Sequence, residues 1–214
     1  MGTLRNFLIC FRFKKQRKEI AQIMRRLYQQ RLTTTSGGNI SLRLGNIVII
    51  TASQTDKGNM TFKDVGVILI TGKNLTPKLK PTIESEMHLS IYNARPDISA
   101  IVHAHPVYAT ALTASQGLIE TDISCEAYAT IGVAAFAEYR AMGTSKLAHL
   151  VAEKSKNSNI VIMQHHGIVA MGKTLLQSFD RLEAIETTAQ ATVIRKICNI
   201  VNKPDNEQLT SGNS

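Results

Sequence analysis

Two histidines, His103 and His105, stand at the end of an apolar stretch and could bind one metal ion together. Ile101 and Val102 predict a buried strand, and Pro106 predicts its end, because proline has no N–H to donate to a neighbouring strand. Alternate side chains of a strand point to the same face, so the two imidazoles would lie roughly 6.5–7 Å apart along it. This spacing suits two ligands of one metal, although two polar residues that only end a strand would have the same pattern.

A second apolar stretch, residues 159–163, also leads into a pair of histidines, His165 and His166, which Gly167 follows. Three neutral imidazoles from the ends of two strands match a catalytic zinc site, in which one coordination position stays open for water or substrate. Adjacent residues of a strand face opposite ways, so only one of His165 and His166 is expected to be a ligand. The spacing leaves open which of the two it is.

The composition is that of a globular protein with a single domain. The chain has 214 residues, of which 43% are hydrophobic and 19% charged, enough for one substantial core. Cys10, Cys125 and Cys198 are far apart, so we expect neither a disulfide framework nor a thiolate zinc site. Unpaired cysteines suit a reducing cytoplasm. Residues 7–11 form an apolar run too short for a signal peptide, and no stretch reaches the roughly 18 apolar residues of a membrane helix. We therefore expect a cytoplasmic protein without membrane contact.

The formal net charge of +9 suits either a nucleic-acid surface or a protein that handles anionic metabolites. Basic residues cluster only at residues 14–18 and at Arg25 and Arg26, within a stretch of helical periodicity. The chain has no tryptophan and lacks the interleaved aromatic residues of single-strand binders. We therefore interpret the basic run as a solvated helix face and expect no nucleic-acid partner.

The rest of the pattern predicts helices that alternate with strands. We expect an N-terminal extension at residues 1–13, one domain at 14–202 and a polar tail at 203–214. Helices are predicted from about residues 14, 81, 107, 144 and 174, and strands, besides the two that lead to histidines, at 40–44, 47–51, 65–70, 131–136 and 168–171. The last helix should bury Phe179, Leu182, Ala189, Val193 and Ile197. Such alternation predicts a mixed α/β sheet covered by helices.

Five ordered motifs, spread over about residues 16–200, resemble those of the class II aldolase/adducin family. They are Ser36-Gly37-Gly38-Asn39-Ile40-Ser41, Ile50-Thr51-Ala52-Ser53, Lys80-Pro81-Thr82-Ile83-Glu84, His103-Ala104-His105-Pro106 and Gln164-His165-His166-Gly167. The resemblance, which is closest to the L-fuculose-1-phosphate aldolases, implies a three-layer α/β/α fold with a mixed, largely antiparallel central sheet. It also implies a homotetramer.

The resemblance further implies roles for single residues. The third metal ligand of the family directly precedes the glycine, so His103, His105 and His166 would bind one zinc ion per subunit. Glu84 would transfer a proton, although a glutamate in the first turn of a helix also occurs because it complements the helix dipole. The implied reaction cleaves or forms a ketose 1-phosphate, from dihydroxyacetone phosphate and an aldehyde, through an enediolate that the metal stabilises. The substrate phosphate would contact four loop residues, Gly38, Asn39, Ser53 and Thr82.

The chain departs from the aldolase pattern at several positions. Gln54 and Ile83 stand where the pattern has glycine and serine, and Glu126 stands near a tyrosine that the aldolase takes from a neighbouring subunit. No tyrosine follows Tyr139, so a sugar phosphate other than L-fuculose 1-phosphate is expected. Glutamate at position 84 favours an aldolase over the related epimerase, whose pattern has aspartate there. The alternatives are an epimerase of the L-ribulose-5-phosphate type, a dehydratase of the methylthioribulose-1-phosphate type, and a non-catalytic adducin-like binding protein.

Overall fold

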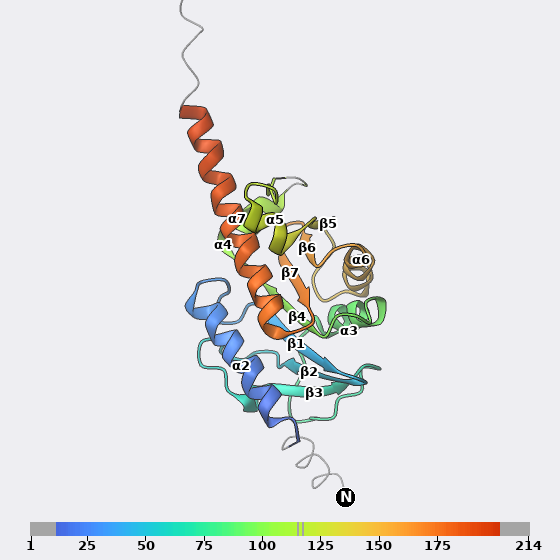
Figure 1. Cartoon of the computed structure of the whole chain (residues 1–214). Coiled ribbons are helices and arrows are strands. Elements are labelled where there is room, and N and C mark those ends of the chain that lie inside the picture. Colours follow the sequence, from blue (N-terminus) through green and yellow to red (C-terminus); the bar gives the residue numbers. More distant parts are fainter. Residues whose placement is uncertain (1–11, 115, 117, 202–214) are drawn as a thin grey trace, which may run out of the picture.

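A seven-stranded sheet forms the centre of the computed structural model, which describes residues 12–114, 116 and 118–201 (Figure 1). The strand order is β3-β2-β1-β4-β7-β6-β5, and every neighbouring pair is antiparallel except β5 and β6. The strands are β1 (Asn39–Leu44), β2 (Ile47–Thr51), β3 (Val65–Leu69), β4 (Ala100–Ala104), β5 (Ala135–Ala137), β6 (Ile160–Met163) and β7 (Gly167–Gly172). The predicted tail and most of the predicted N-terminal extension lie outside the described residues.

Helices cover both faces of the sheet. They are α2 (Lys14–Gln29), α3 (Ser85–Ala94), α4 (Val107–Ala111), α5 (Cys125–Ile131), α6 (Ser145–Ser155) and α7 (Leu175–Val201), with two 3₁₀ turns, η1 (Phe62–Asp64) and η2 (Leu112–Ala114). Helices α2, α4, α5 and α7 pack in one core, whereas α3 and α6 pack in the other (Figure 1). The predicted three-layer α/β/α fold with a largely antiparallel mixed sheet is therefore confirmed.

Strand β4 lies in the middle of the sheet and is buried on both faces. Val102 and Ala104 belong to the core under α7, and Ile101 belongs to the core under α3. This alternation follows the two-residue period of a strand and places His103 on the α3 side. The sheet thus turns the predicted metal ligand toward the helix that carries Glu84.

The predicted strand at residues 131–136 begins too early, since only its last two residues belong to β5. This region contains the end of α5, whose N-cap residue, Ser124, accepts a side-chain hydrogen bond from the Ala127 N–H. The helix ends at Gly132, whose φ of 65° is a conformation that glycine adopts without steric cost. The strand β5 begins only at Ala135 and has three residues. An apolar sequence alone did not distinguish the end of a helix from the start of a strand.

Helix α3 begins at Ser85, several residues after the predicted start at Pro81. Pro81 instead forms an isolated bridge with Ala52, and Thr82 N–H donates to the Thr51 carbonyl, so this segment is extended beside the end of β2. Glu84 is the N-cap residue of α3, but its side chain makes no capping hydrogen bond. The carboxylate is therefore available to groups outside the helix.

The predicted buried stripe of the last helix is correct for Phe179, Leu182 and Ala189 and wrong for Ile197, which is 54% exposed. Val193 is half-buried. The C-terminal part of α7 extends past the body of the molecule, so no strand lies beneath it (Figure 1). No described helix is long and apolar enough to cross a membrane.

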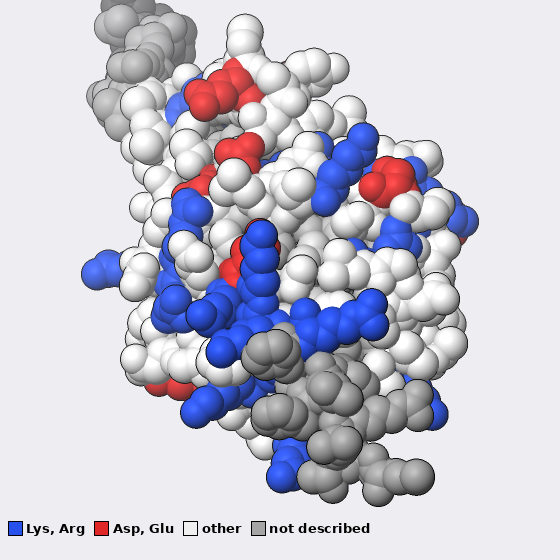
Figure 2. Space-filling view, turned by 60° about the horizontal axis from the view of Figure 1, so that its bottom comes forward, with Lys and Arg blue, Asp and Glu red and all other residues white. Residues whose placement is uncertain are grey.

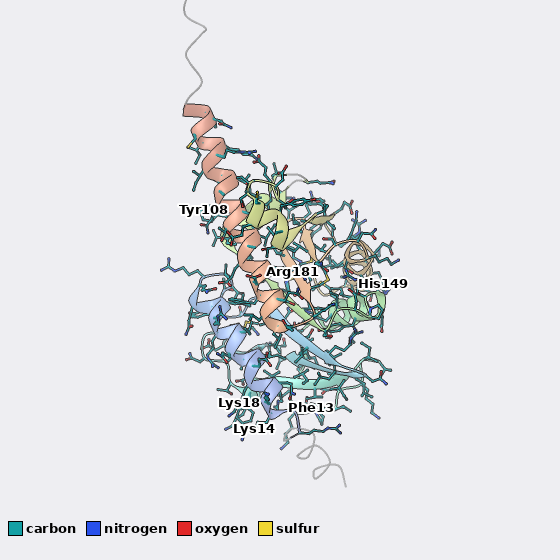
Figure 3. The ribbon with its side chains drawn as sticks, in the orientation of Figure 1. Phe13, Lys14, Lys18, Tyr108, His149 and Arg181 are labelled. Atoms are coloured by element: carbon teal, nitrogen blue, oxygen red, sulfur yellow. The ribbon has the colours of Figure 1, made fainter. Side chains whose placement is uncertain are left out.

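Basic side chains gather on the face that carries α2 (Figure 2). Lys14 and Lys18 lie one turn apart on this helix and are exposed (Figure 3). Two arginines of α2 instead bind backbone carbonyls, since Arg17 donates to Val65 at 2.7 Å and Arg25 donates to Met60 at 2.5 Å. Part of the basic run therefore attaches α2 to the loop and strand beneath it.

Both edges of the sheet are short or covered. Strand β5 offers only three residues at one edge. At the other edge, the chain that follows β3 folds back, with an isolated bridge between Ile68 and Asn74 and a hydrogen bond from Leu75 N–H to the Val67 carbonyl. One edge of the sheet is thus covered by the chain itself, and the other offers only a short strand.

We predict that Phe179→Ala lowers the free energy of unfolding by about 3–5 kcal/mol, because it removes a fully buried ring from the core under α7. Leu176→Ala on the same helix is the control, since Leu176 is 61% exposed and its loss should cost less than about 0.5 kcal/mol. Urea unfolding of the two variants measures the difference. Equal midpoints would contradict the packing described here.

Candidate functional site

His103 and His105 face one another at the end of β4. The Nε2 atoms of the two rings are 3.1 Å apart, and the ring centroids are 4.7 Å apart. His103 Nδ1 lies 2.9 Å from the Ile168 carbonyl of β7, which only accepts, so this nitrogen carries the hydrogen. In a neutral ring, Nε2 of His103 then carries a lone pair directed at His105, whereas in a protonated ring Nε2 donates to the Glu84 carboxylate. Two nitrogens of one strand end are thus directed at a common point, as the sequence predicts.

The third imidazole comes from the turn between β6 and β7. Strand β6 ends at Met163, so the tandem histidines lie on the turn and not on the strand. His166 joins the cluster, with its ring centroid 5.0 Å from that of His103, and the potential ligand atoms of the three rings lie within 4.8 Å of one another. His165 is exposed, has a φ of 55°, and lies beside Tyr139 with 6.4 Å between ring centroids. The structure therefore brings His166, and not His165, to the other two histidines.

The approach of this turn to β4 depends on Gly167. A Cβ atom at position 167 would lie 2.6 Å from the Ala104 carbonyl oxygen and 2.6 Å from Cδ2 of His105. The first contact is with backbone, which cannot move away as a flexible side chain could. A glycine after the tandem histidines is thus a steric requirement for the cluster.

Glu84 completes the site from the N-terminus of α3. Its Oε2 lies 3.2 Å from His103 Nε2, and its Oε1 lies 3.3 Å from His166 Nε2. Asn39 Nδ2 donates a hydrogen bond of 2.8 Å to Oε2. The carboxylate is 6% exposed, so it reaches the histidine cluster from the protein interior.

The charges of the site depend on one another. Burial disfavours the ionised Glu84 carboxyl, but the adjacent His103 and the hydrogen bonds from His103 and Asn39 outweigh burial and hold its pKa well below the usual range. Burial also disfavours a charged His103, yet the Glu84 carboxylate raises the His103 pKa. Burial, with repulsion from His103, lowers the pKa of His105 to about 3 and that of His166 to about 4. His105 and His166 are therefore neutral at pH 7, as metal ligands must be.

The residues of the cluster fit a bound divalent cation. Without a cation or a proton between them, the lone pairs of His103 and His105 would repel one another at 3.1 Å. The buried Oε1 of Glu84 has no hydrogen-bond partner, although it lies 3.3 Å from His166. The ring nitrogens of the three histidines and this carboxylate oxygen converge, and a shared positive charge would stabilise them. Imidazole nitrogens with a carboxylate oxygen are ligands that zinc and other transition metals accept.

The four residues predicted to contact a phosphate lie on adjacent loops. Gly38 has a φ of 68°, and a Cβ there would lie 2.7 Å from the His103 carbonyl. Ser53 N–H donates to the Lys80 carbonyl at 2.8 Å, and Thr82 Oγ1 accepts from Glu84 N–H at 3.4 Å. The side-chain amide of Asn39 is bonded to Glu84 and to His88. The segments that carry Ser53 and Thr82 are thus joined just before α3, and Gly38 and Asn39 lie against His103 and Glu84.

Of the three positions that depart from the aldolase pattern, two lie beside the site and one lies on α5. Gln54 has a φ of 56°, the left-handed conformation that a glycine would adopt without strain. Ile83 is 52% exposed beside Glu84. Glu126 is exposed on α5 and lines a cleft of about 300 Å³ between α5 and α7. The first two positions therefore alter the loops beside the site.

The sequence motifs predict no role for three buried polar residues behind Glu84. His88 Nε2 lies 2.5 Å from Asn39 Oδ1, Ser41 Oγ lies 2.7 Å from His88 Nδ1, and the Tyr92 hydroxyl lies 2.8 Å from Ser41 Oγ. Their spacing was a usable signal. Residues four apart share one side of a helix, as Glu84, His88 and Tyr92 do, and alternate residues share one face of a strand.

Comparison with known proteins identifies similar chains. The family model of the Class II Aldolase and Adducin N-terminal domain matches residues 18–193. An L-fuculose phosphate aldolase of Methanococcus maripaludis is 34% identical over 176 residues, which cover 82% of this chain and 95% of the relative. A solved L-fuculose 1-phosphate aldolase is 31% identical, with a TM-score of 0.77 and 88% of each chain covered. YgbL of Escherichia coli, whose activity is left open between aldolase, epimerase and decarboxylase, has a TM-score of 0.80 and 26% identity, with 85% of this chain and 89% of YgbL covered.

We predict about one divalent metal ion per chain, because three imidazoles with an open position hold one ion. Elemental analysis after dialysis should show metal lost from His103→Ala, His105→Ala and His166→Ala. His165→Ala is the matched control, since this neighbour points away from the cluster, and it should keep its metal. Loss of metal from His165→Ala with retention in His166→Ala would reverse the assignment.

Proposed function

Because the chain belongs to the class II aldolase and adducin family, we propose that it is a metal-dependent aldolase that cleaves or forms a ketose 1-phosphate. The products of cleavage would be dihydroxyacetone phosphate and an aldehyde. The observation that carries this proposal is the Glu84 carboxylate, buried and 3.2 Å from His103 Nε2 in a site of three histidines. The predicted family and the prediction of a class II aldolase, a lyase, are confirmed by the family match and by relatives named aldolases.

We assign His103, His105 and His166 as ligands of one zinc ion per chain. Neutral imidazoles whose lone pairs converge on a point are the donors that zinc takes in catalytic sites. The Ile168 carbonyl supports this assignment, because by accepting from His103 Nδ1 it selects the tautomer whose Nε2 lone pair faces the site. Zinc bound there would polarise the carbonyl of the sugar phosphate as a Lewis acid.

Glu84 is the proposed proton-transfer group. A carboxylate can take the proton from the hydroxyl on the carbon whose bond to its neighbour breaks. It can also return a proton to the carbon beside the carbonyl. Its position at the N-cap of α3, without a capping bond, leaves both oxygens directed at the histidine cluster. Asn39 donates to Oε2 and so supports the ionised form that acts as a base.

The loops beside Glu84 would bind the substrate phosphate. We assign Gly38, Asn39, Ser53 and Thr82 to this contact. Backbone N–H groups and hydroxyls of glycine-rich loops bind anions without a lysine. Ile83 and Gln54 change the side chains next to these loops, which supports a ketose 1-phosphate other than L-fuculose 1-phosphate.

A second candidate is an epimerase, a dehydratase or a decarboxylase that uses the same metal and the same carboxylate. The resemblance to YgbL, for which aldolase, epimerase and decarboxylase are all considered, favours keeping this alternative. Both candidates act on sugar phosphates and suit a reducing cytoplasm, in agreement with the free thiols of Cys125 and Cys198. The products formed from one substrate panel separate them.

We predict that the metal-loaded protein releases dihydroxyacetone phosphate from at least one member of a panel of ketose 1-phosphates, detected by a coupled assay. Glu84→Gln should keep its fold and metal but lower turnover by about 10²–10⁴, the usual contribution of a general acid–base. Glu86→Gln is the matched control. It changes an exposed first-turn glutamate of the same helix, so turnover should stay near that of the unmodified protein.

Near-normal turnover of a folded, metal-loaded Glu84→Gln protein would remove Glu84 from the mechanism. The residue would then be only a glutamate that the helix dipole favours, which is worth a few tenths to about 1 kcal/mol of stability. A product other than dihydroxyacetone phosphate would select the second candidate.

We also propose a homotetramer, on the basis of the family resemblance. Light scattering at micromolar concentration should give four times the chain mass of 23.5 kDa. A monomeric mass would overturn the tetramer and exclude any catalytic contribution from a neighbouring subunit.

A further inference from the structure

A continuous set of polar side chains lies buried behind Glu84, between the sheet and α3. Asn39 and Ser41 come from β1, and His88 and Tyr92 come from α3. None of the four is more than 3% exposed. Buried polar groups are costly unless each one has a hydrogen-bond partner, so the bonds within this set determine one another's direction.

The first link is the side-chain amide of Asn39, which can adopt two orientations related by a half-turn. With its N–H toward Glu84 the amide stabilises the carboxylate, and with its oxygen toward Glu84 it repels the carboxylate. Asn39 alone does not select between them, because its oxygen and nitrogen have the same shape. The ionised Glu84 favours the first orientation, and a hydrogen-bond donor on the other side of the amide would fix it.

His88 is that group. Its Nε2 lies 2.5 Å from Asn39 Oδ1, and an amide oxygen only accepts, so Nε2 carries a hydrogen. Burial, with repulsion from His103, lowers the His88 pKa to about 3, so at pH 7 the ring has a single N–H. Nδ1 must then accept, and the Ser41 hydroxyl donates to it at 2.7 Å.

Tyr92 ends the chain of bonds. Because the Ser41 hydroxyl is used as a donor to His88, its oxygen accepts from the Tyr92 hydroxyl at 2.8 Å, which is shorter than the 3.3 Å between that hydroxyl and the Ser99 carbonyl. The Tyr92 ring is held by the Arg43 guanidinium, 5.0 Å from the ring centroid, and Arg43 also donates to the Tyr92 carbonyl at 2.8 Å. Arg43 thus holds Tyr92 in place, and each polar group from Tyr92 to Glu84 specifies the direction of the next bond.

We infer that His88 is a positioning residue for Glu84, because its Nε2–H holds the Asn39 amide with the N–H directed at the carboxylate. This inference rests on the proposed role of Glu84 in proton transfer. Without His88 the amide loses the donor that fixes its orientation, and the hydrogen bond from Asn39 to the Glu84 carboxylate is less well directed. The phosphate loops and the metal ligands stay in place, so the loss falls on the chemical step.

The alternative is that His88 only fills space in the core under α3. Two substitutions separate these roles. His88→Leu keeps a buried side chain but removes both ring nitrogens. His88→Gln offers an N–H to Asn39 and a carbonyl oxygen to Ser41, and so can restore the direction of the bonds. Ile91→Val is the matched control, since it loosens the same buried side of α3 without touching the polar set.

For His88→Leu we expect kcat to fall about 10- to 100-fold. This is the usual size of the loss when a residue that orients the groups around a metal site is removed. The metal content, and KM for the substrate that the panel identifies, should stay within about two-fold of the values for the unmodified protein. His88→Gln should recover most of the lost kcat. If kcat of His88→Leu falls no further than that of Ile91→Val at matched melting temperature, the positioning role is overturned.

A measurement on the unmodified, metal-loaded protein keeps the test independent of activity and of the folding of any variant. Long-range ¹H–¹⁵N spectra of the labelled chain report which ring nitrogen of His88 carries the hydrogen. We expect Nε2–H at pH 7, and an Nδ1–H tautomer would overturn the inference. If Glu84→Gln keeps its turnover the proposed function fails, whereas the tautomer still decides whether His88 orients Asn39.

Discussion

The site depends on how closely the turn between β6 and β7 approaches strand β4. That approach is possible because position 167 has no side chain, since a Cβ would lie 2.6 Å from the Ala104 carbonyl. The antiparallel pairing of β4 and β7 then places Ile168 opposite Ala104, and its carbonyl accepts from His103. On the other side of β4, the pairing with β1 places Asn39 opposite His103. Two strand pairings and one glycine thus assemble groups from three parts of the sequence.

A buried carboxylate is costly unless nearby groups stabilise its negative charge. In this structure the histidines and the Asn39 amide stabilise Glu84. His103 and the Asn39 amide both approach Oε2 of Glu84, and His166 approaches Oε1. Because the compensation is shared, each group has a fixed orientation before substrate arrives. Preorganised groups of this kind do not have to reorient during the reaction, which is a main source of enzymatic rate.

Part of this arrangement could be predicted from the sequence. The two-residue period of a strand correctly placed His103 and His105 together, and the alternating elements correctly gave the layered fold. Choosing His166 over His165 needed either the family resemblance or the turn geometry, because adjacent residues carry no such signal. The position of Glu84 was not predictable in detail, since Pro81 pairs with Ala52 and delays the helix start, a tertiary contact that local sequence does not encode. Ile197 was misplaced because periodicity does not reveal where the sheet beneath a helix ends.

The two edges of the sheet have a consequence for the protein at high concentration. A free edge strand offers unpaired N–H and C=O groups to other chains, and sheets that expose long edges associate into fibrils. Here β5 is three residues long, and β3 is bonded by the segment that follows it through Asn74 and Leu75. The molecule therefore stays resistant to strand-by-strand aggregation even though the interior strands β4, β6 and β7 are among its most apolar and β-prone segments.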